Sequence, residues 1–594
     1  MHVISLAFKN RLALQLRMKD ETSKGVFSLV GKDQNSLSQT NWRLVIVFAL
    51  AVLAFISLIT RLGWIQLIRG AELQQEAWKQ WSQDINIEAQ RGEILDRNGE
   101  ILTGNVTSSK IFAYPEEIQS VDTAAAEVSR IFGIDYDKVK DKLQEDTTRV
   151  ELMETSDAEF GRIIQDKEAI HLPGIERKTD SGRYYPHESM ASQVLGFVGD
   201  EQGWSGLEYE YEEELAGKDG WMLHQISPDM KEIPHGEGQF VPPKDGKDLK
   251  TTLDVNIQYV LERELEKALE EHEAKNAMAL VMDPNNGEVL AMGSKPDYHP
   301  ADYQDYEGQK RQNPLIENSF EPGSTFKPTT LSASIEENNF DPNRGFHSTG
   351  TIDVAGTTIS CWSGGHDEML DFREVVYRSS NPGFVVMGQE LGKETLMRYI
   401  QGLGYGERTG IDLPGESRGS IPELEQKGPV ELATVSFGQG VSVTPIQQAV
   451  ALSAIANEGE IVTPYVGKKL MGEAETEQNL GENKKVRQAI SEITANKATD
   501  ILEGVVEEGT GDNAQIEGIN VAGKTGTAQK PAPDGGYYED KYIASFIGFA
   551  PANDPELLVY VAVDTPQTYP PWGGHIAAPV FREIMKDSLN FFRD

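Results

Sequence analysis

Three short polar motifs in the second half of the chain contain residue types that can carry out nucleophilic catalysis. They are Ser324 and Lys327 in EPGSTFKPTT, Ser379 and Asn381 in YRSSNPGF, and Lys524 in VAGKTGTAQ. A Ser-x-x-Lys pair arises by chance on the order of once or twice in a chain of this length. The order of the three motifs along one stretch of chain is therefore more informative than any one of them.

The first motif can supply a nucleophile together with its base. If a helix begins near Gly323, residues three apart lie on one face, and the Lys327 amine reaches the Ser324 hydroxyl. Lysine can take the serine proton only when it is neutral, which requires burial or a neighbouring positive charge that lowers its pKa. Lys524 is the candidate for that charge. Taken alone, the same pair is more typical of a helix-cap serine beside a surface lysine.

The second motif can handle the proton of a leaving group. The Ser379 hydroxyl is suited to relay a proton to a departing amine, while the Asn381 side chain can hold an amide of the substrate. A capping or turn pair is the other interpretation of this motif, because both residue types are common in turns.

The third motif, KTGT, is typical of a β-strand at the edge of a sheet. Gly526 is expected to let a ligand backbone approach closely, while Lys524, Thr525 and Thr527 offer donors to a carboxylate. The backbone N–H groups of Ser324 and Thr527 would then form an oxyanion hole. An ordinary strand with a surface lysine is the alternative.

The elements that must position these motifs begin with a helix and a hairpin. A domain boundary is predicted at residues 233–248, where proline, glycine and charged residues crowd together. The helix that follows, over residues 254–273, has an apolar face at helical spacing. Its members are Ile257, Val260, Leu261, Leu265, Ala268 and Leu269. The runs AMALVMDP and EVLAMGS, joined by Asn-Asn-Gly, predict a β-hairpin.

The end of the chain supplies the rest of an α/β domain. YIASFIGFA and ELLVYVAVD predict two more strands, and a helix is predicted over residues 579–592 with Pro579 in its first turn. The first and last helices are expected to cover the sheet. The middle is mainly helical, and it includes a helix with Pro445 at its first position and a capping box of Thr444 and Gln447. We therefore expect an antiparallel sheet between helices, plus a helical subdomain.

An apolar run near the N-terminus predicts a membrane anchor. Residues 44–60 carry no charge, lie between Arg43 and Arg61, and just reach the length that spans a bilayer. The basic flank before them is expected to stay inside, so the rest of the chain lies outside the cytoplasm. A buried core helix and a cleaved signal peptide are the alternatives, although the Ala-x-Ala pattern at residues 49–51 lies within the run.

The remaining residues narrow the function classes. Residues 85–240 mix short strands with charged helices and predict an α+β pedestal domain, in which EYEYEEELAGKDG forms a solvated acidic face. The formal net charge of −39 argues against nucleic-acid binding. Cys361 is the single cysteine, so no intrachain disulfide can form. We expect no cofactor and no metal site.

The ordered trio of motifs resembles the penicillin-binding proteins and serine β-lactamases, which share S-x-x-K, S-x-N and K-[ST]-G. The segments RGEILDRNGEIL, RYYP and GLEYEYEEELAG are similar to the pedestal boxes of class B penicillin-binding proteins. MDPNNGEVLAM, FEPGSTFKP and FGQGVSVTPIQ are similar to their transpeptidase domain. The resemblance extends from the anchor to the last helix.

This resemblance implies a bitopic serine D,D-transpeptidase that cross-links peptidoglycan. It implies a cytoplasmic basic tail at 1–43, a transmembrane anchor at 44–62, a dimerisation-like pedestal at 63–245 and a transpeptidase domain at 246–594. Ser324 would attack the carbonyl between the two terminal D-alanines of a stem peptide, and the acyl group would pass to an amine of a neighbouring stem. β-Lactams would be covalent inhibitors, and a SEDS-family polymerase would be a partner.

Two other functions remain open at this point. A β-lactam or D,D-peptide hydrolase would use the same motifs with water as the acceptor, and a non-catalytic division scaffold could retain the fold. The anchor and pedestal argue against a diffusing hydrolase, and the intact motifs argue against a scaffold. A septal, an elongation and a sporulation role are not distinguished by these residues.

Overall fold

The computed structural model describes residues 41–67, 82–145, 147–156, 173–199, 202–225, 239–364, 367–472, 477–481 and 485–593. The predicted basic tail lies outside these residues except for positions 41–43, and so do residues 233–238 of the predicted boundary at 233–248. The chain divides into two compact units, Met1–Ile85 with Leu223–Gln239, and Asn86–Met222 with Phe240–Asp594. Each unit is described by itself below.

The smaller unit contains the apolar helix predicted from the sequence. Helix α2 spans Asn41–Leu67, and Val45–Gln66 within it has a mean hydropathy of 2.6 with no part of its apolar window buried. The structure therefore has one helix, among the described residues, that is long and apolar enough to cross a membrane. The alternative of a buried core helix is wrong. A three-stranded sheet is formed, in the order β1-β6-β7, by Ser82–Ile87, Gly220–Gln225 and Gln239–Val241.

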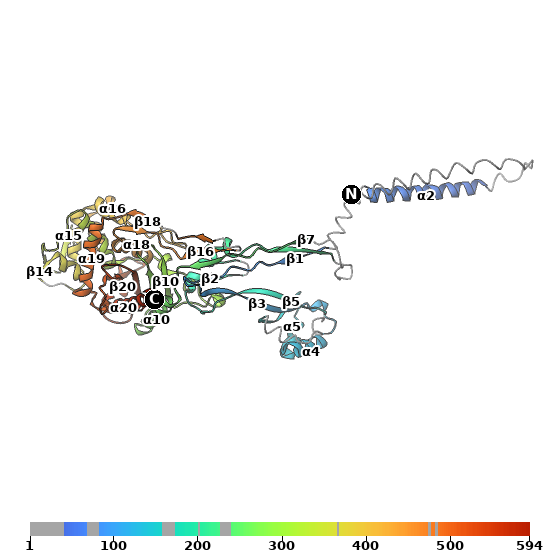
Figure 1. The fold of residues 1–594 in the computed structure, drawn as a ribbon, viewed down its shortest axis with the longest axis horizontal. Helices are drawn as coiled ribbons and strands as arrows, with labels where there is room; N and C mark the ends of the chain where they lie inside the picture. Colours follow the sequence, from blue (N-terminus) through green and yellow to red (C-terminus); the bar gives the residue numbers. More distant parts are fainter. Residues whose placement is uncertain are drawn as a thin grey trace, which may run out of the picture. The chain divides into compact units, whose positions relative to one another are not determined.

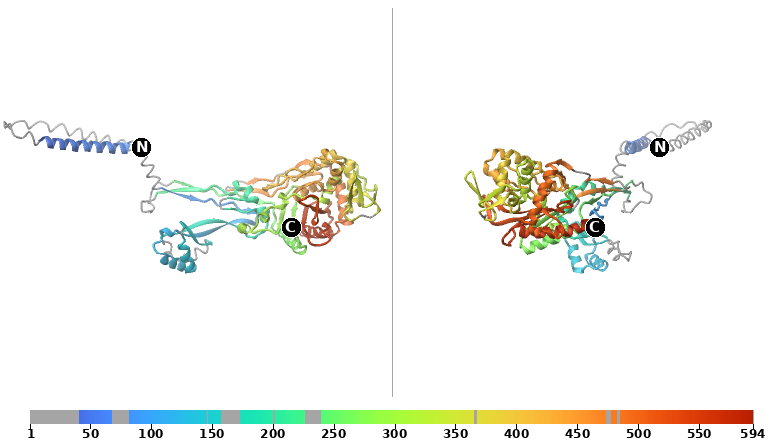
Figure 2. Two further views of the ribbon diagram at one scale, coloured as in Figure 1. Left: turned by 180° about the vertical axis from the view of Figure 1, so that it is seen from behind. Right: turned by 60° about the vertical axis from the view of Figure 1, so that its left-hand side comes forward.

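The pedestal part of the larger unit is α+β, as predicted. Its strands are β2 (Ile94–Leu95), β3 (Ile101–Ala113), β4 (Val150–Ser156), β5 (Ile175–Tyr184) and β8 (Asp248–Thr251). Its helices are η1 (Pro115–Glu117), α4 (Val121–Phe132), α5 (Tyr136–Leu143), α7 (Ser192–Leu195), α8 (Gly206–Glu210) and α9 (Glu212–Leu215). Helices α4 and α5 lie together at the end of the paired strands β3 and β5 (Figure 2).

A buried ion-pair cluster joins distant segments of the pedestal. The Glu208 carboxylate accepts hydrogen bonds from Arg91 Nε and Arg183 Nε, each at 2.7 Å. Arg183 also donates to Asn105 Oδ1 at 2.7 Å and to Gly92 O at 2.8 Å. The prediction of a solvated acidic face is wrong at Glu208, because two arginines from other segments compensate its charge in the interior.

The central sheet of the larger unit has five strands in the order β10-β9-β21-β20-β19, all antiparallel to their neighbours, and Figure 1 labels β10 and β20 of this sheet. They are β9 (Asn276–Met282), β10 (Val289–Lys295), β19 (Ala522–Pro531), β20 (Tyr537–Ala550) and β21 (Leu557–Asp564). The predicted hairpin of β9 and β10 and the two predicted C-terminal strands are confirmed. Helices α10 (Val255–Glu271) and α20 (Gly573–Arg593) share a hydrophobic core with one face of this sheet, as predicted.

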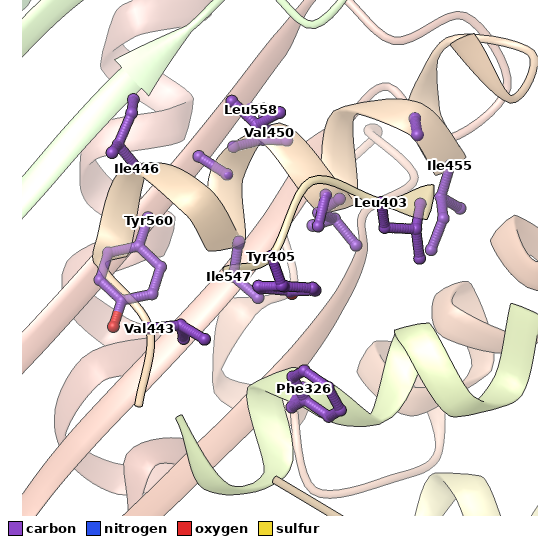
Figure 3. Packing of buried hydrophobic residues seen from close by; sticks show 14 of the residues in the cluster. Phe326, Leu403, Tyr405, Val443, Ile446, Val450, Ile455, Ile547, Leu558 and Tyr560 are labelled. Atoms are coloured by element: carbon purple, nitrogen blue, oxygen red, sulfur yellow. The ribbon is translucent and has the colours of Figure 1, made fainter. Parts of the chain in front are cut away.

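The other face of the sheet packs against the helical subdomain. Helix α18 (Pro445–Ala456) is buried along its whole length, and Figure 3 shows its residues Ile446, Val450 and Ile455 in one cluster of buried side chains with Tyr560 of β21 and Phe326. The predicted capping box is confirmed: Thr444 Oγ1 accepts from the Gln447 N–H, and Gln447 Oε1 accepts from the Thr444 N–H. These two hydrogen bonds give partners to two N–H groups at the start of an apolar helix that begins inside the core.

Short elements complete the domain. Its further helices are η3 (Pro300–Asp305), α11 (Gly308–Arg311), α12 (Pro314–Glu317), η4 (Gly323–Phe326), α13 (Lys327–Glu336), α14 (Phe372–Tyr377), α15 (Asn381–Leu391), α16 (Lys393–Gly402), η5 (Leu424–Gln426), α17 (Pro429–Val435), α19 (Glu492–Glu507) and η7 (Asp512–Ala514). Its further strands are β11 (Gly345–Ser348), β12 (Thr351–Val354), β13 (Thr357–Ser360), β14 (Glu368–Asp371), β15 (Glu460–Val462), β16 (Gly467–Met471), β17 (Glu477–Asn479) and β18 (Lys485–Gln488).

The predicted start of the last helix at Pro579 is wrong. Helix α20 begins at Gly573, and Pro579 lies inside it. The pair Gly573 and Gly574 is typical of a loop, but here glycine is required by packing, because a Cβ at Gly573 would lie 2.2 Å from the Gly526 carbonyl oxygen. Pro579 removes the hydrogen bond to the carbonyl of His575, a residue that is exposed to solvent.

The substitution Glu208→Gln is expected to destabilise the protein by about 3 kcal/mol, because it leaves the Arg91 and Arg183 guanidinium groups buried without their counter-charge. Urea unfolding followed by circular dichroism measures the change. Glu213→Gln, on the exposed side of the same acidic segment, is the matched control and should change stability by less than about 0.5 kcal/mol. Equal stability of the two variants would contradict a structural role for the cluster.

Candidate active site

The three polar motifs meet at one cavity of about 270 Å³ in the larger unit. Ser324, Ser379, Asn381, Thr525 and Thr527 line it. The other lining residues are Gly323, Trp362, Phe437, Gln439, Gly509, Thr510, Asp512, Trp572, Gly573, Gly574 and His575. Lys327 and Lys524 are fully buried beneath the hydroxyl groups that line the cavity. Five residues from three separate motifs therefore share one surface, with two lysines behind them.

Ser324 lies on a 3-10 turn rather than in the first turn of an α-helix. The turn η4 spans Gly323–Phe326, and α13 begins at Lys327, whose N–H donates to the Ser324 carbonyl. Gly323 has a φ of +57° and donates its N–H to Gly438 O at 3.0 Å. The predicted helix start near Gly323 is confirmed in position. Pro328 is the second residue of α13, where an N–H would have no partner within the helix.

The Lys327 amine is held by the second motif. Its Nζ donates to Ser379 O at 2.8 Å, to Ser379 Oγ at 3.0 Å and to Asn381 Oδ1 at 2.8 Å. Among the hydrogen bonds of the described residues, none joins Lys327 to Ser324, so the predicted direct pair is not formed. Two carbonyl oxygens are stronger acceptors than a hydroxyl group, and they draw the amine toward Ser379.

The Lys524 amine approaches the same serine from the sheet. Its Nζ donates to Ser379 Oγ at 2.9 Å and also lies within hydrogen-bond distance of Thr525 O and Thr525 Oγ1. Burial lowers the pKa of Lys524 to about 7. Burial also lowers the pKa of Lys327 well below its ordinary value, and the nearby charge of Lys524 lowers it further. The predicted effect of Lys524 on Lys327 is confirmed, with burial as the larger cause.

Ser379 is the point where the two lysines meet. It follows α14 and precedes α15 in a left-handed conformation, with a φ of +56° that costs a serine about 1 kcal/mol or more. Both lone pairs of its Oγ can accept from an amine, one from Lys327 and one from Lys524. When Lys327 carries its third proton, both lone pairs are used in this way, and the hydroxyl proton of Ser379 is free to be donated to an atom in the cavity.

The KTGT motif lies at the edge of the sheet, as predicted. β19 is the last strand in the order, so its outer side carries no neighbouring strand among the described residues. Thr527 Oγ1 accepts from the Gly573 N–H at 3.0 Å. Gly526 was predicted to let a ligand backbone approach, but its nearest neighbours belong to this protein. A Cβ at Gly526 would lie 2.4 Å from Ser545 Oγ and 2.8 Å from Thr325 Cγ2. Glycine makes room for the chain's own turn at this point rather than for a ligand.

Two tryptophans at the cavity were not identified from the sequence. The rings of Trp362 and Trp572 lie edge to face with centroids 5.1 Å apart, and Trp362 Nε1 donates to Arg378 O at 3.1 Å. Both residues are partly exposed and precede glycines, in CWSGG and PPWGGH. An exposed tryptophan in a glycine-containing loop is a signal for a binding surface that could have indicated them.

Comparison with known families identifies both parts of the larger unit. Residues 277–586 match the penicillin binding protein transpeptidase domain, and residues 86–251 match the penicillin-binding protein dimerisation domain. The chain is 42% identical over 556 residues to stage V sporulation protein D of Bacillus subtilis (strain 168), covering 92% of this chain and 85% of that protein. It is 29% identical over 559 residues to the probable peptidoglycan D,D-transpeptidase PenA of Neisseria meningitidis, covering 92% of each.

Solved structures agree with these matches. Penicillin binding protein 2X from Streptococcus thermophilus superposes with a TM-score of 0.73 at 26% identity, covering 86% of this chain and 80% of that chain. Penicillin binding protein 3 from Mycobacterium tuberculosis, complexed with aztreonam, gives a TM-score of 0.67 at 27% identity, and the match covers 86% of this chain and 97% of that chain.

The rate at which a penicillin acylates the protein is expected to follow a bell-shaped pH profile. As the pH rises through the lowered pKa of Lys327, the amine loses its proton and becomes a base, so the rate increases. Above about 7, the pKa to which burial lowers Lys524, the second amine loses the charge that attracts a carboxylate, so the rate decreases. Stopped-flow acylation measures the profile, and a rate that keeps rising well above a pH of about 7 would contradict it.

Proposed function

The chain belongs to the penicillin-binding protein transpeptidase family, a family of serine D,D-transpeptidases that act on peptidoglycan stem peptides and bind β-lactams, and we propose that Ser324 is its nucleophile. The observation that carries this proposal is the position of Ser324 in the cavity beside Ser379, whose hydroxyl receives both buried lysines. A neutral amine and a charged amine around one hydroxyl form a proton-transfer site.

In the first step, Ser324 Oγ attacks the carbonyl carbon between the two terminal D-alanines of a stem peptide. Neutral Lys327, one turn along the chain, takes the hydroxyl proton as the C–O bond forms. The carbonyl oxygen becomes an oxyanion, and the N–H groups of Ser324 and Thr527, which line the cavity, are the donors we assign to it. The acyl C–N bond then breaks.

The leaving amine needs a proton, and Ser379 is suited to supply it. Its own proton moves to the nitrogen of the departing D-alanine while its Oγ receives one from Lys327. Lys327 returns to the neutral form, so atoms and charges balance over the step. In the second half-reaction, an amine of a neighbouring stem peptide takes the place of the departed D-alanine, and the same path runs in reverse.

The third motif is assigned to substrate binding. The charged Lys524, with Thr525 and Thr527 on the cavity wall, would bind the carboxylate of the terminal D-alanine. Asn381 uses its Oδ1 on Lys327 and one Nδ2 proton on Ser360 O at 3.1 Å. Its second Nδ2 proton remains available to hold an amide carbonyl of the substrate.

The location and partners extend the proposal beyond the site. We assign residues 44–62 to a single-pass anchor, 63–245 to the pedestal and 246–594 to an extracytoplasmic transpeptidase domain. The apolar helix α2 and the family matches at 86–251 and 277–586 support this division. A SEDS-family polymerase is the proposed partner, because class B members have no glycosyltransferase domain of their own.

The substitution Ser324→Ala is expected to abolish covalent labelling of the full-length protein by a fluorescent penicillin. Ser319→Ala, an exposed serine outside the cavity, is the matched control and should label at the normal rate. Peptide mapping of the wild-type adduct should find it on the peptide that contains Ser324. Normal labelling of Ser324→Ala would move the nucleophile elsewhere, and rapid release of the label by water would favour a hydrolase.

A further inference from the structure

A buried polar chain connects the central sheet to the turn that carries Ser324. Thr325 Oγ1 lies 2.9 Å from Pro322 O and 2.5 Å from Gln448 Oε1, and Gln448 Nε2 lies 3.4 Å from the Tyr560 hydroxyl. All four residues are buried: Pro322 lies directly before η4, Thr325 in η4, Gln448 in the first turn of α18 and Tyr560 in β21. None of them lines the cavity, so they do not touch a substrate bound there. Figure 3 shows Tyr560 beside the start of α18.

The number of protons in this chain determines its direction. The Thr325 hydroxyl has one proton but faces two carbonyl oxygens, those of Pro322 and Gln448. Burial raises the pKa of Tyr560, so its phenol keeps its proton. Thr325 Oγ1 therefore shares its proton between Gln448 Oε1 and Pro322 O, and Gln448 Nε2 donates to the Tyr560 hydroxyl. Each of these polar atoms then has a partner.

This chain of hydrogen-bonded side chains holds a residue that lies between the two donors of the proposed oxyanion hole. Thr325 directly follows Ser324, and its methyl group lies against Gly526, where a Cβ would be 2.8 Å from Thr325 Cγ2. Gly526 directly precedes Thr527, the second residue assigned to the oxyanion. Thr325 therefore sets the separation between the two donor N–H groups, and Gln448 holds Thr325 against the strand.

We propose that Gln448 is a positioning residue for acyl transfer, which joins Tyr560 of the sheet to Thr325 and so holds Ser324 in register with Thr527. The inference rests on the proposed role of Ser324 as the nucleophile. Small displacements of a reacting group lower rates by large factors, about 100-fold for an ångström. The effect of losing Gln448 should therefore appear in the acylation step and not in the initial binding of ligand.

The test compares three variants of the full-length protein in detergent. Gln448→Met and Thr325→Val each break the chain and keep nearly the same side-chain volume. Val450→Ala is the matched control, because this buried residue of α18 belongs to the hydrophobic core but not to the polar chain. Stopped-flow measurements with a fluorescent penicillin give the acylation rate constant and the dissociation constant of the initial complex, and thermal unfolding gives the melting temperature.

We expect the acylation rate constant to fall at least about tenfold in Gln448→Met and Thr325→Val, with the initial dissociation constant changed less than about twofold. Val450→Ala should lose thermal stability and still acylate within about twofold of wild type. The inference is overturned if Gln448→Met acylates at the wild-type rate, or if Val450→Ala slows as much at equal destabilisation. If Gln448→Met does not fold, Thr325→Val decides by the same criteria.

A fourth variant provides a pH signature. In Gln448→Glu the ionised carboxylate cannot donate to Tyr560, whereas the protonated acid can replace the amide. The ratio of its acylation rate to that of wild type should therefore rise as the pH falls, while the ratio for Val450→Ala stays constant. A flat ratio would contradict the polar chain. Failure of Ser324→Ala to lose labelling would instead refute the proposed function, so the two outcomes are distinguishable.

Discussion

The site depends on one interaction, the hydroxyl of Ser379 held between two fully buried lysines. Two ammonium groups this close together and out of water cannot both keep their charge: burial lowers the pKa of each, and the charge of Lys524 lowers that of Lys327 further. The lysine with the more strongly lowered pKa, Lys327, becomes the base. Lys524 keeps enough charge near neutral pH to attract a carboxylate. The cost of burying them is offset by a core built on two sides of the sheet.

The packing around this interaction explains several glycines. Gly526 admits the turn that follows Ser324, and Gly573 lets α20 begin directly against β19. Gly438 lies so close to Gly323 that a Cβ would be 2.1 Å from the Gly323 carbonyl oxygen. These contacts bring η4, β19 and α20 together around one cavity. The reactive groups are therefore held by backbone against backbone, which allows less movement than contacts between long side chains.

Local patterns in the sequence predicted the local structure well. The capping box of Thr444 and Gln447 and the hairpin of β9 and β10 follow from turn chemistry within a few residues, and both are confirmed. The partners of charged and polar groups could not be predicted in the same way. Glu208 is buried because arginines 25 and 117 positions away reach it, and Lys327 bonds to a residue 52 positions away. The spacing of motifs along the sequence does not indicate which residues from such distant segments come into contact.

The central claim is that burial beside Lys524 lowers the pKa of Lys327 well below its ordinary value, so that its amine can act as a base. Nitrogen NMR of lysine labelled at Nζ, with the Lys327 signal assigned by its absence in Lys327→Arg, measures this directly across a pH titration. The account predicts that Lys327 titrates well below the ordinary lysine pKa of about 10.4. A Lys327 signal that remains that of an ammonium group up to that pH would contradict it.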